Sequence, residues 1–190
     1  MNAAELSFLV DSQRAYFKSG KTLPVTARIS ALSALRKALL SHEQEIYAAL
    51  QQDLGKSQAE TYMCELGMVL SELSYMIRHT RKLAADRRCP TPLSQFAARS
   101  FVKTSPRGVV LIMSPWNYPI MLALDPLADA IAAGNTAVIK PSAYAPASSA
   151  LLQTILGEIF PPQYVAVVTG GREENQQLPL EPLFLRLHCR

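Results

Sequence analysis

The sequence predicts an α/β protein in which N-terminal helices are followed by half of a doubly wound parallel sheet. The distribution of proline supports this, because only Pro24 of the 13 prolines precedes residue 89 and the first part therefore lacks helix breakers. From 106 to 170, short apolar runs alternate with segments of helix length. The charged residues of that stretch are Arg107, Asp125, Asp129, Lys140 and Glu158. So few charges are expected where strands are buried on both faces.

Residues 1–85 are predicted to be helical. The expected helices cover about residues 4–19, 25–54 and 58–83. Apolar residues spaced by three, four and seven form one stripe from Val25 to Leu50, and Gly55 is placed to end that helix. A capping-box pattern follows at Ser57-Gln-Ala-Glu60, so a further helix is expected to begin there.

The second half predicts alternating strands and helices. Residues 86–106 are interpreted as a linker that leads into one or two edge strands. The predicted order after it is strand, helix, strand, helix, strand, over 109–113, 119–133, 136–139, 147–160 and 164–168. This unit, assigned to 107–177, is half of a doubly wound dinucleotide-binding sheet, and 178–190 form a divergent tail. Because the GxGxxG fingerprint is absent, the ordinary phosphate loop is not expected.

Composition excludes several classes of protein. Of the 190 residues, 49% are hydrophobic and 18% charged, which does not fit a disordered chain. The net charge is +4, but the basic residues lie among acidic ones, which disfavours a nucleic-acid partner. The three cysteines form no metal or disulfide pattern, so neither a metal site nor a disulfide framework is expected. With no signal peptide and no long apolar run, we expect a cytoplasmic protein without a transmembrane segment.

Two segments carry candidate chemistry, since both follow predicted strands at the edge where open α/β sheets bind ligands. In Ser114-Pro-Trp-Asn-Tyr-Pro119, the carboxamide of Asn117 is suited to hold a developing oxyanion, or else Asn117 is a turn residue that caps the next helix. In Lys140-Pro-Ser-Ala143, Lys140 either donates to ribose hydroxyls or a phosphate, or is a solvated lysine at a strand end.

Together these segments resemble the aldehyde dehydrogenase superfamily. The likeness rests on Pro106-Arg-Gly-Val-Val, Pro115-Trp-Asn-Tyr-Pro119, Ala132-Ala-Gly-Asn135 and Lys140-Pro-Ser142, and it runs from about residue 5 to residue 177. The Trp-Asn-Tyr-Pro segment is most similar to the class 3 branch. The resemblance implies an incomplete aldehyde dehydrogenase N-terminal domain, an aldehyde substrate, NAD or NADP as cofactor, and a homo-oligomer at full length.

The resemblance also implies roles for individual residues. Asn117 corresponds to the oxyanion-hole asparagine, and Tyr118 to an aromatic wall of the aldehyde tunnel. The cofactor-binding positions it implies are Ser114, Pro115, Trp116, Lys140, Ser142, Gly170 and Gly171. In the family reaction a cysteine thiolate attacks the aldehyde, hydride passes to NAD(P)+, and a glutamate-activated water hydrolyses the thioester.

The sequence departs from the family pattern in two respects. Ala143 stands where the family commonly has an acidic residue, which weakens discrimination against the 2′-phosphate of NADP. The family's cysteine and glutamate would follow position 190, and Cys64, Cys89 and Cys189 lack the Gly-Gln-x-Cys context. We therefore expect the chain alone to be inactive, and we interpret it as a truncated or frame-shifted reading of a longer gene.

Two other functions stay open. One is a non-catalytic remnant that serves as a nucleotide-binding or oligomerisation module. The other is a superfamily enzyme that forms acyl-CoA or reduces acyl phosphates. The pairing of Trp116-Asn117 with Lys140-Pro141 favours aldehyde oxidation over the latter.

Overall fold

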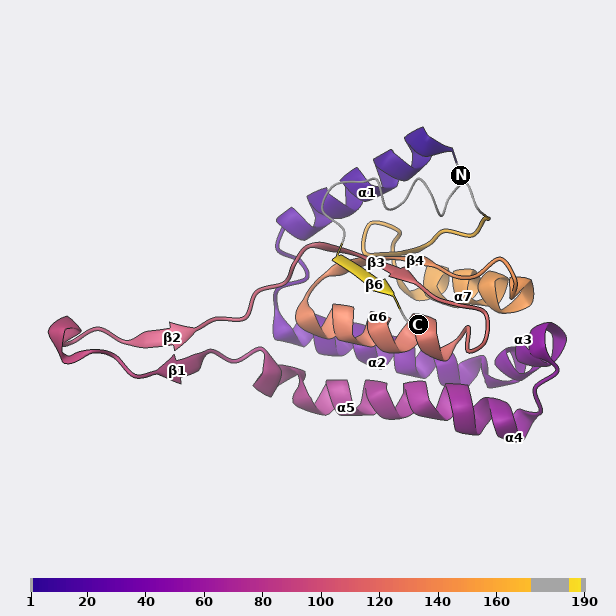
Figure 1. Cartoon of the computed structure of the whole chain (residues 1–190), viewed down its shortest axis with the longest axis horizontal. Coiled ribbons are helices and arrows are strands. Elements are labelled where there is room, and N and C mark those ends of the chain that lie inside the picture. Colours follow the sequence, from indigo (N-terminus) through magenta and orange to yellow (C-terminus); the bar gives the residue numbers. More distant parts are fainter. Residues whose placement is uncertain (1, 172–184, 189–190) are drawn as a thin grey trace.

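The computed structural model describes residues 2–171 and 185–188, and it confirms the predicted α/β class. Figure 1 shows a layered body from which a thin two-stranded arm projects. None of the helices in the described part of the chain is long and apolar enough to cross a membrane.

The first helices follow the prediction with one correction. Helix α1 spans Ala3–Lys18, α2 spans Val25–Ser41 and α3 spans Glu43–Leu54, so the stripe expected to form one helix is divided at His42. His42 leaves the helical conformation, with ψ +22°, and the Ser41 hydroxyl bonds the Ala38 carbonyl at the end of α2. The turn lets α2 pack against α5 and α6 while α3 packs against α7.

The next helical run contains a wide turn that the sequence did not predict. Helix α4 (Gln58–Thr61) continues through a π-helical turn, η1 (Tyr62–Leu66), into α5 (Gly67–Leu83). The amide of Gly67 donates to the Tyr62 carbonyl, and a Cβ at Gly67 would lie 2.6 Å from that oxygen. A glycine at this position therefore makes the π turn possible.

The segment expected to supply edge strands forms a separate hairpin. Strands β1 (Arg87–Cys89) and β2 (Ser100–Val102) pair with each other in antiparallel fashion, with the 3₁₀ turn η2 (Leu93–Gln95) between them. They form a two-stranded sheet of their own and do not pair with the parallel sheet. The hairpin is the arm in Figure 1, and among the described strands each of its two strands pairs with the other.

The main sheet has four parallel strands in the order β5-β4-β3-β6. Its elements are β3 (Val109–Met113), α6 (Met121–Ala133), β4 (Thr136–Lys140), α7 (Pro146–Ile159), β5 (Val165–Val167) and β6 (Leu185–His188). Strand β6 comes from the tail, where no strand was expected. The order is that of a doubly wound sheet, in which the winding direction reverses between β3 and β6.

Both faces of the sheet are buried, as the apolar strand runs predicted. On one face Val109, Leu111 and Val138 pack with Leu6 of α1. On the other face Ile112 and alternating strand residues pack with α6 and α7, and α2 and α5 pack onto these helices in the same core. Figure 1 shows α1 on the opposite side of the sheet from α2, α5 and α6. Helices on both faces leave the carboxyl ends of the strands as the place where loops can form a site.

Candidate functional site

Three loops meet at the carboxyl edge of the sheet, one after each of β3, β4 and β5. The amide of Ser114 donates to the carbonyl of Lys140 at 3.2 Å. The ammonium of Lys140 donates in turn to the carbonyls of Pro141 and Gly170, each at 2.8 Å. The predicted positions Ser114, Lys140 and Gly170 are therefore joined by hydrogen bonds.

Lys140 is not the solvated strand-end lysine that the sequence left possible. It is 2% exposed, and its ammonium holds the loop after β4 against the loop after β5. Gly170 has φ +140°, in the region that favours glycine, and Gly171 beside it is half-buried. The lysine at this edge thus fixes the shape of the loops.

A hollow of about 310 Å³ opens beside these loops. It is lined by Pro141, Ser142, Ala143, Pro146, Ser149, Ala150, Gln153, Thr169 and Gly170. Ser142 shapes its wall, because its carbonyl accepts from the Ser149 hydroxyl at 3.0 Å and its own hydroxyl accepts from the Tyr144 amide at 3.2 Å. The small side chains leave room for a flat ring.

The loop after β3 presents Asn117 to solvent. Trp116 is 53% exposed, Pro115 is half-buried, and the Asn117 side chain is exposed. The Asn117 carboxamide makes no hydrogen bond to any described residue, whereas its backbone carbonyl accepts from Lys56 at 2.9 Å. The amides at the start of α6, those of Ile120 and Met121, donate to Glu65. Asn117 is therefore not the cap of this helix, and its carboxamide is available to a ligand.

The residues that hold this loop were missed by sequence reasoning. Lys56 and Glu65 are 8% and 0% exposed, and Lys56 Nζ lies 2.5 Å from Glu65 Oε1. The same ammonium lies 4.1 Å from the centre of the half-buried Tyr118 ring. One signal pointed to Glu65, since this charge sits beside Leu66 within the apolar face of its helix.

Both helices that begin at this edge are capped by distant carboxylates. Glu65 accepts the first amides of α6, at 2.9 Å for Ile120 and 3.3 Å for Met121. Asp53 accepts the amides of Ala147 and Ser148 of α7 at 3.1 and 2.7 Å. A phosphate group cannot use helix ends that already hold negative charge. This agrees with the missing GxGxxG fingerprint.

The described cysteines do not line the hollow beside Ser142. Cys64 is a free thiol in the π turn and Cys89 is a free thiol in β1, while Cys189 lies outside the described residues. Within residues 2–171 and 185–188, no group of three or more histidine, cysteine or carboxylate side chains is placed to hold a metal ion.

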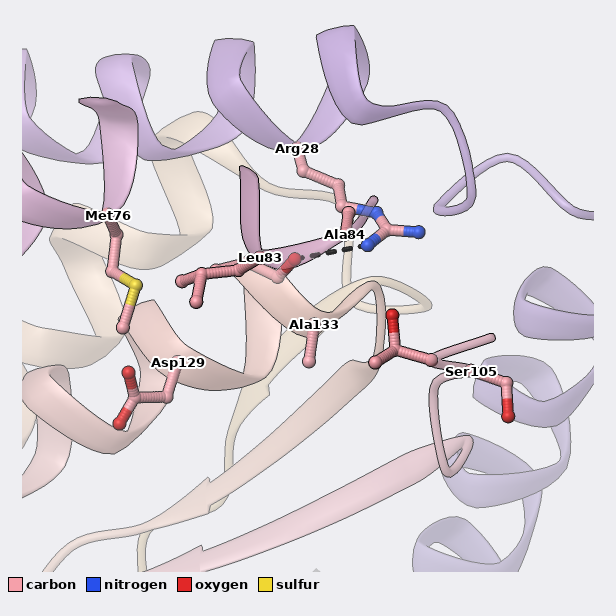
Figure 2. Close-up of a pocket in the computed structure, with 9 residues that line it drawn as sticks. Arg28, Met76, Leu83, Ala84, Ser105, Asp129 and Ala133 are labelled. Atoms are coloured by element: carbon pink, nitrogen blue, oxygen red, sulfur yellow. Dashed lines mark hydrogen bonds between the residues drawn. The ribbon is translucent and has the colours of Figure 1, made fainter. Parts of the chain in front are cut away.

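A second hollow, of about 230 Å³, lies at the opposite end of α6 (Figure 2). Its arginine, Arg28, donates to the carbonyls of Thr22, Leu23 and Ala132 at 2.7–3.1 Å. Burial lowers the pKa of Arg28, and the Asp129 carboxylate in Figure 2 makes no contact with it. Because three backbone carbonyls occupy the guanidinium, this hollow is a structural junction rather than a ligand site.

The carboxyl edge suits a nucleotide. The hydroxyl of Ser114 is buried and has no hydrogen-bond partner, as expected where a polar ligand completes a site. The hollow beside Ser142 has a volume of about 310 Å³, and Ala143 on its wall carries no charge. The residues present therefore fit NAD or NADP.

Fold and edge together define a class: a doubly wound α/β unit whose first loop presents an unbonded carboxamide at the carboxyl edge of the sheet. The model of the aldehyde dehydrogenase family matches residues 1–183, and the chain belongs to that family. It is 38% identical over 178 residues to 4,4'-diaponeurosporen-aldehyde dehydrogenase of Staphylococcus aureus, covering 94% of this chain and 38% of the relative. It is 39% identical to the dimeric, NADP-preferring aldehyde dehydrogenase of Canis lupus familiaris, covering 92% of this chain and 39% of that one.

Solved structures give the same result. The substrate-bound state of Staphylococcus aureus AldH superposes with a TM-score of 0.91 at 37% identity, covering 96% of this chain and 40% of that chain. A bifunctional proline utilization A protein superposes with a TM-score of 0.83 at 26% identity. The resemblance to the class 3 branch is confirmed by relatives such as family 3 member H1 of Arabidopsis thaliana, at 39% identity. The chain spans less than two-fifths of the length of these curated relatives.

Proposed function

We propose that this chain supplies the oxyanion donor and the nucleotide-binding edge of an enzyme that oxidises aldehydes to carboxylic acids with NAD or NADP. The observation that carries the proposal is the free carboxamide of Asn117, on a loop that is hydrogen-bonded through Ser114 to Lys140 at the nucleotide hollow. The oxyanion donor and the nucleotide edge are thereby fixed to each other.

The chain's own residues perform three tasks in this reaction. The Asn117 amide donates to the oxygen of the aldehyde as it gains negative charge, and such a donor stabilises the tetrahedral state more than the substrate. Trp116 and the backbone around Ser114 and Pro115 line the nicotinamide side, and Tyr118 forms an aromatic wall for the aldehyde. When bound, the nucleotide supplies the hydride acceptor.

The nucleotide's adenosine half is assigned to the hollow after β4 and β5. Ser142 and Gly170 line it, Gly171 follows Gly170 in the chain, and Lys140 donates to the ribose by exchanging one of its carbonyl partners. Ala143 presents no carboxylate to a 2′-phosphate. The relative from Canis lupus familiaris is named NADP-preferring, and we propose that this chain also accepts NADP.

We place the nucleophilic cysteine and the glutamate base outside the described residues. Cys64 lies in the π turn and Cys89 in the hairpin, and neither lines the hollow beside Ser142. The proposal therefore concerns an enzyme in which further residues complete the site, and it assigns no turnover to the 190-residue chain alone.

A chimera tests this proposal. Residues 1–177 are joined to the remaining length of the Staphylococcus aureus relative, and NAD(P)H formation is followed with short aliphatic and aromatic aldehydes. Asn117→Ala should lower turnover by about 10²–10³ while leaving nucleotide affinity unchanged. An active chimera that is indifferent to Asn117→Ala would remove Asn117 from the oxyanion site.

A second candidate function is an oligomerisation module, and the projecting hairpin favours it. Its turn leaves Leu93 and Phe96 at 92% and 90% exposed, and Phe101 of β2 at 56%. Exposed apolar side chains on an unpaired hairpin are suited to a partner subunit. Sedimentation of the chain, with and without Phe96→Ser and Phe101→Ser, tests it: self-association should be lost in the variants.

A further inference from the structure

We propose that Lys56 and Glu65 form a clamp that sets the position of the Asn117 loop, so that both are positioning residues for the oxyanion donor. The clamp is defined as Lys56, Glu65 and the backbone groups that they bond: the carbonyl of Asn117 and the amides of Ile120 and Met121. This inference rests on the proposed function for the meaning of Asn117.

The clamp grips the loop at both ends of the turn that leads into α6. Lys56 Nζ donates to the Asn117 carbonyl at 2.9 Å, and Glu65 Oε2 accepts from Ile120 at 2.9 Å and from Met121 at 3.3 Å. The other Glu65 oxygen binds Lys56 at 2.5 Å. Each bond has a charged partner, and bonds of this kind are stronger than those between neutral groups.

The position of the clamp is built into the helical layer. Gly55 ends α3 in the left-handed conformation, with φ +69°, and turns Lys56 inward. The π turn before Gly67 carries Glu65, and π turns are frequent at functional sites. Neither residue belongs to the sheet edge, yet both reach it from the same side.

The arrangement explains why two charges are buried at a site where they do not touch a ligand. A buried ion pair is seldom a net source of stability, because desolvation offsets much of its attraction. Here Lys56 and Glu65 also bond backbone groups of one loop, the loop that carries Asn117. With the Asn117 carbonyl held, the carboxamide is presented in a fixed place, and preorganisation of this kind gives an oxyanion donor its effect.

Hydrogen exchange on the 190-residue chain tests the clamp without any aldehyde or nucleotide. Lys56→Met and Glu65→Gln should accelerate exchange of the Ile120 and Met121 amides by at least about tenfold, while β4 stays unchanged. Lys56→Arg retains a charged donor and should restore slow exchange in part. Lys82→Met, at an exposed lysine of α5, is the matched control and should change nothing.

A double variant separates positioning from stability. Lys56→Met with Glu65→Met replaces the pair by apolar side chains, which often preserves or raises stability. Its unfolding midpoint should return toward that of the parent while the Ile120 and Met121 amides still exchange fast. Slow exchange in the double variant, or acceleration spread evenly over β4 and the loop, would overturn the clamp.

The emission of Trp116 gives a second readout, since it is the single tryptophan and lies beside Asn117. Its quenching by acrylamide should rise in Lys56→Met and in the double variant but not in Lys82→Met. A chain with a selective loop response that binds no nucleotide would keep the clamp and contradict the proposed function. A chain that binds nucleotide but shows no selective loop response would contradict the clamp and keep the proposed function.

Discussion

Replacing Asp125 by asparagine should stabilise the protein at neutral pH. Asp125 and Asp129 lie one turn apart on α6, and Glu72 of α5 faces them. Burial, together with the charges of Glu72 and Asp129, raises the pKa of Asp125 from 3.8 to about 6. One of its carboxylate oxygens is buried without a hydrogen-bond partner. The ionised form is therefore held in the folded state at a cost in free energy.

The size and sign of the effect follow from this shift. A group whose pKa is higher in the folded state binds more protons there, so its contribution to stability is present below about pH 4 and is lost as pH rises through about 6. A shift of about two units corresponds to about 3 kcal/mol for a fully buried group. Asp125 is half-buried, and solvent screening reduces the figure to about 1 kcal/mol.

Urea unfolding at pH 4 and pH 7 measures the effect. Asp125→Asn should raise the free energy of unfolding by about 1 kcal/mol at pH 7 and by little at pH 4, where the aspartate is protonated. The exposed Asp86→Asn serves as the control and should show no such pH dependence. Equal effects of Asp125→Asn at the two pH values would refute the reasoning.

Two further predictions concern other parts of the fold. Gly134→Ala should destabilise the protein by about 2–4 kcal/mol in the same unfolding assay. The reason is that Gly134 has φ +90° and that a Cβ there would lie 2.8 Å from the Arg28 guanidinium carbon. A loss below about 0.5 kcal/mol, which is usual for surface changes, would contradict this prediction. Ala143→Glu should shift binding from NADP toward NAD by about 1–3 kcal/mol, because it adds a carboxylate to the hollow to which we assign the adenosine half of the nucleotide. Unchanged relative dissociation constants for NADH and NADPH would count against that assignment.

Local patterns predicted most of the helices and strands. The strand runs predicted at 109–113 and 136–139 are short and mostly apolar, and the structure has strands at Val109–Met113 and Thr136–Lys140. The helix ends at Gly55 and Gly134 could be predicted because helices commonly end at a glycine with positive φ, and both glycines have it. Such signals lie within a few residues of the element that they specify.

The features that were missed depend on distant parts of the chain. The break at His42 lets α3 pack against α7 while α2 packs mainly against α5 and α6, which a stripe of apolar residues does not record. Strand β6 forms by pairing with β3, more than 70 residues earlier in the chain. The helix caps come from Asp53 and Glu65, at separations of 94 to 95 and 55 to 56 residues, so no capping motif marks them.

The residues of the candidate site also fall into those that the sequence predicted and those that it missed. Asn117 and Lys140 were found because each follows a strand and belongs to a recognisable motif. Lys56 was not found, because it touches the Asn117 carbonyl only after the helical layer has folded over the edge of the sheet. Sequence reasoning thus identified the groups that would meet ligand and missed those that hold them.

Nucleotide binding by the chain tests most directly whether the carboxyl edge of the sheet is a cofactor site. Titration with NADPH, followed by energy transfer from Trp116 to the nicotinamide, should show saturable quenching in the parent and in Lys82→Met. Lys140→Met should abolish it while circular dichroism stays unchanged, because the loops after β4 and β5 lose the ammonium that joins them. Saturable binding that is indifferent to Lys140→Met, or the absence of binding in a folded parent chain, would contradict the account.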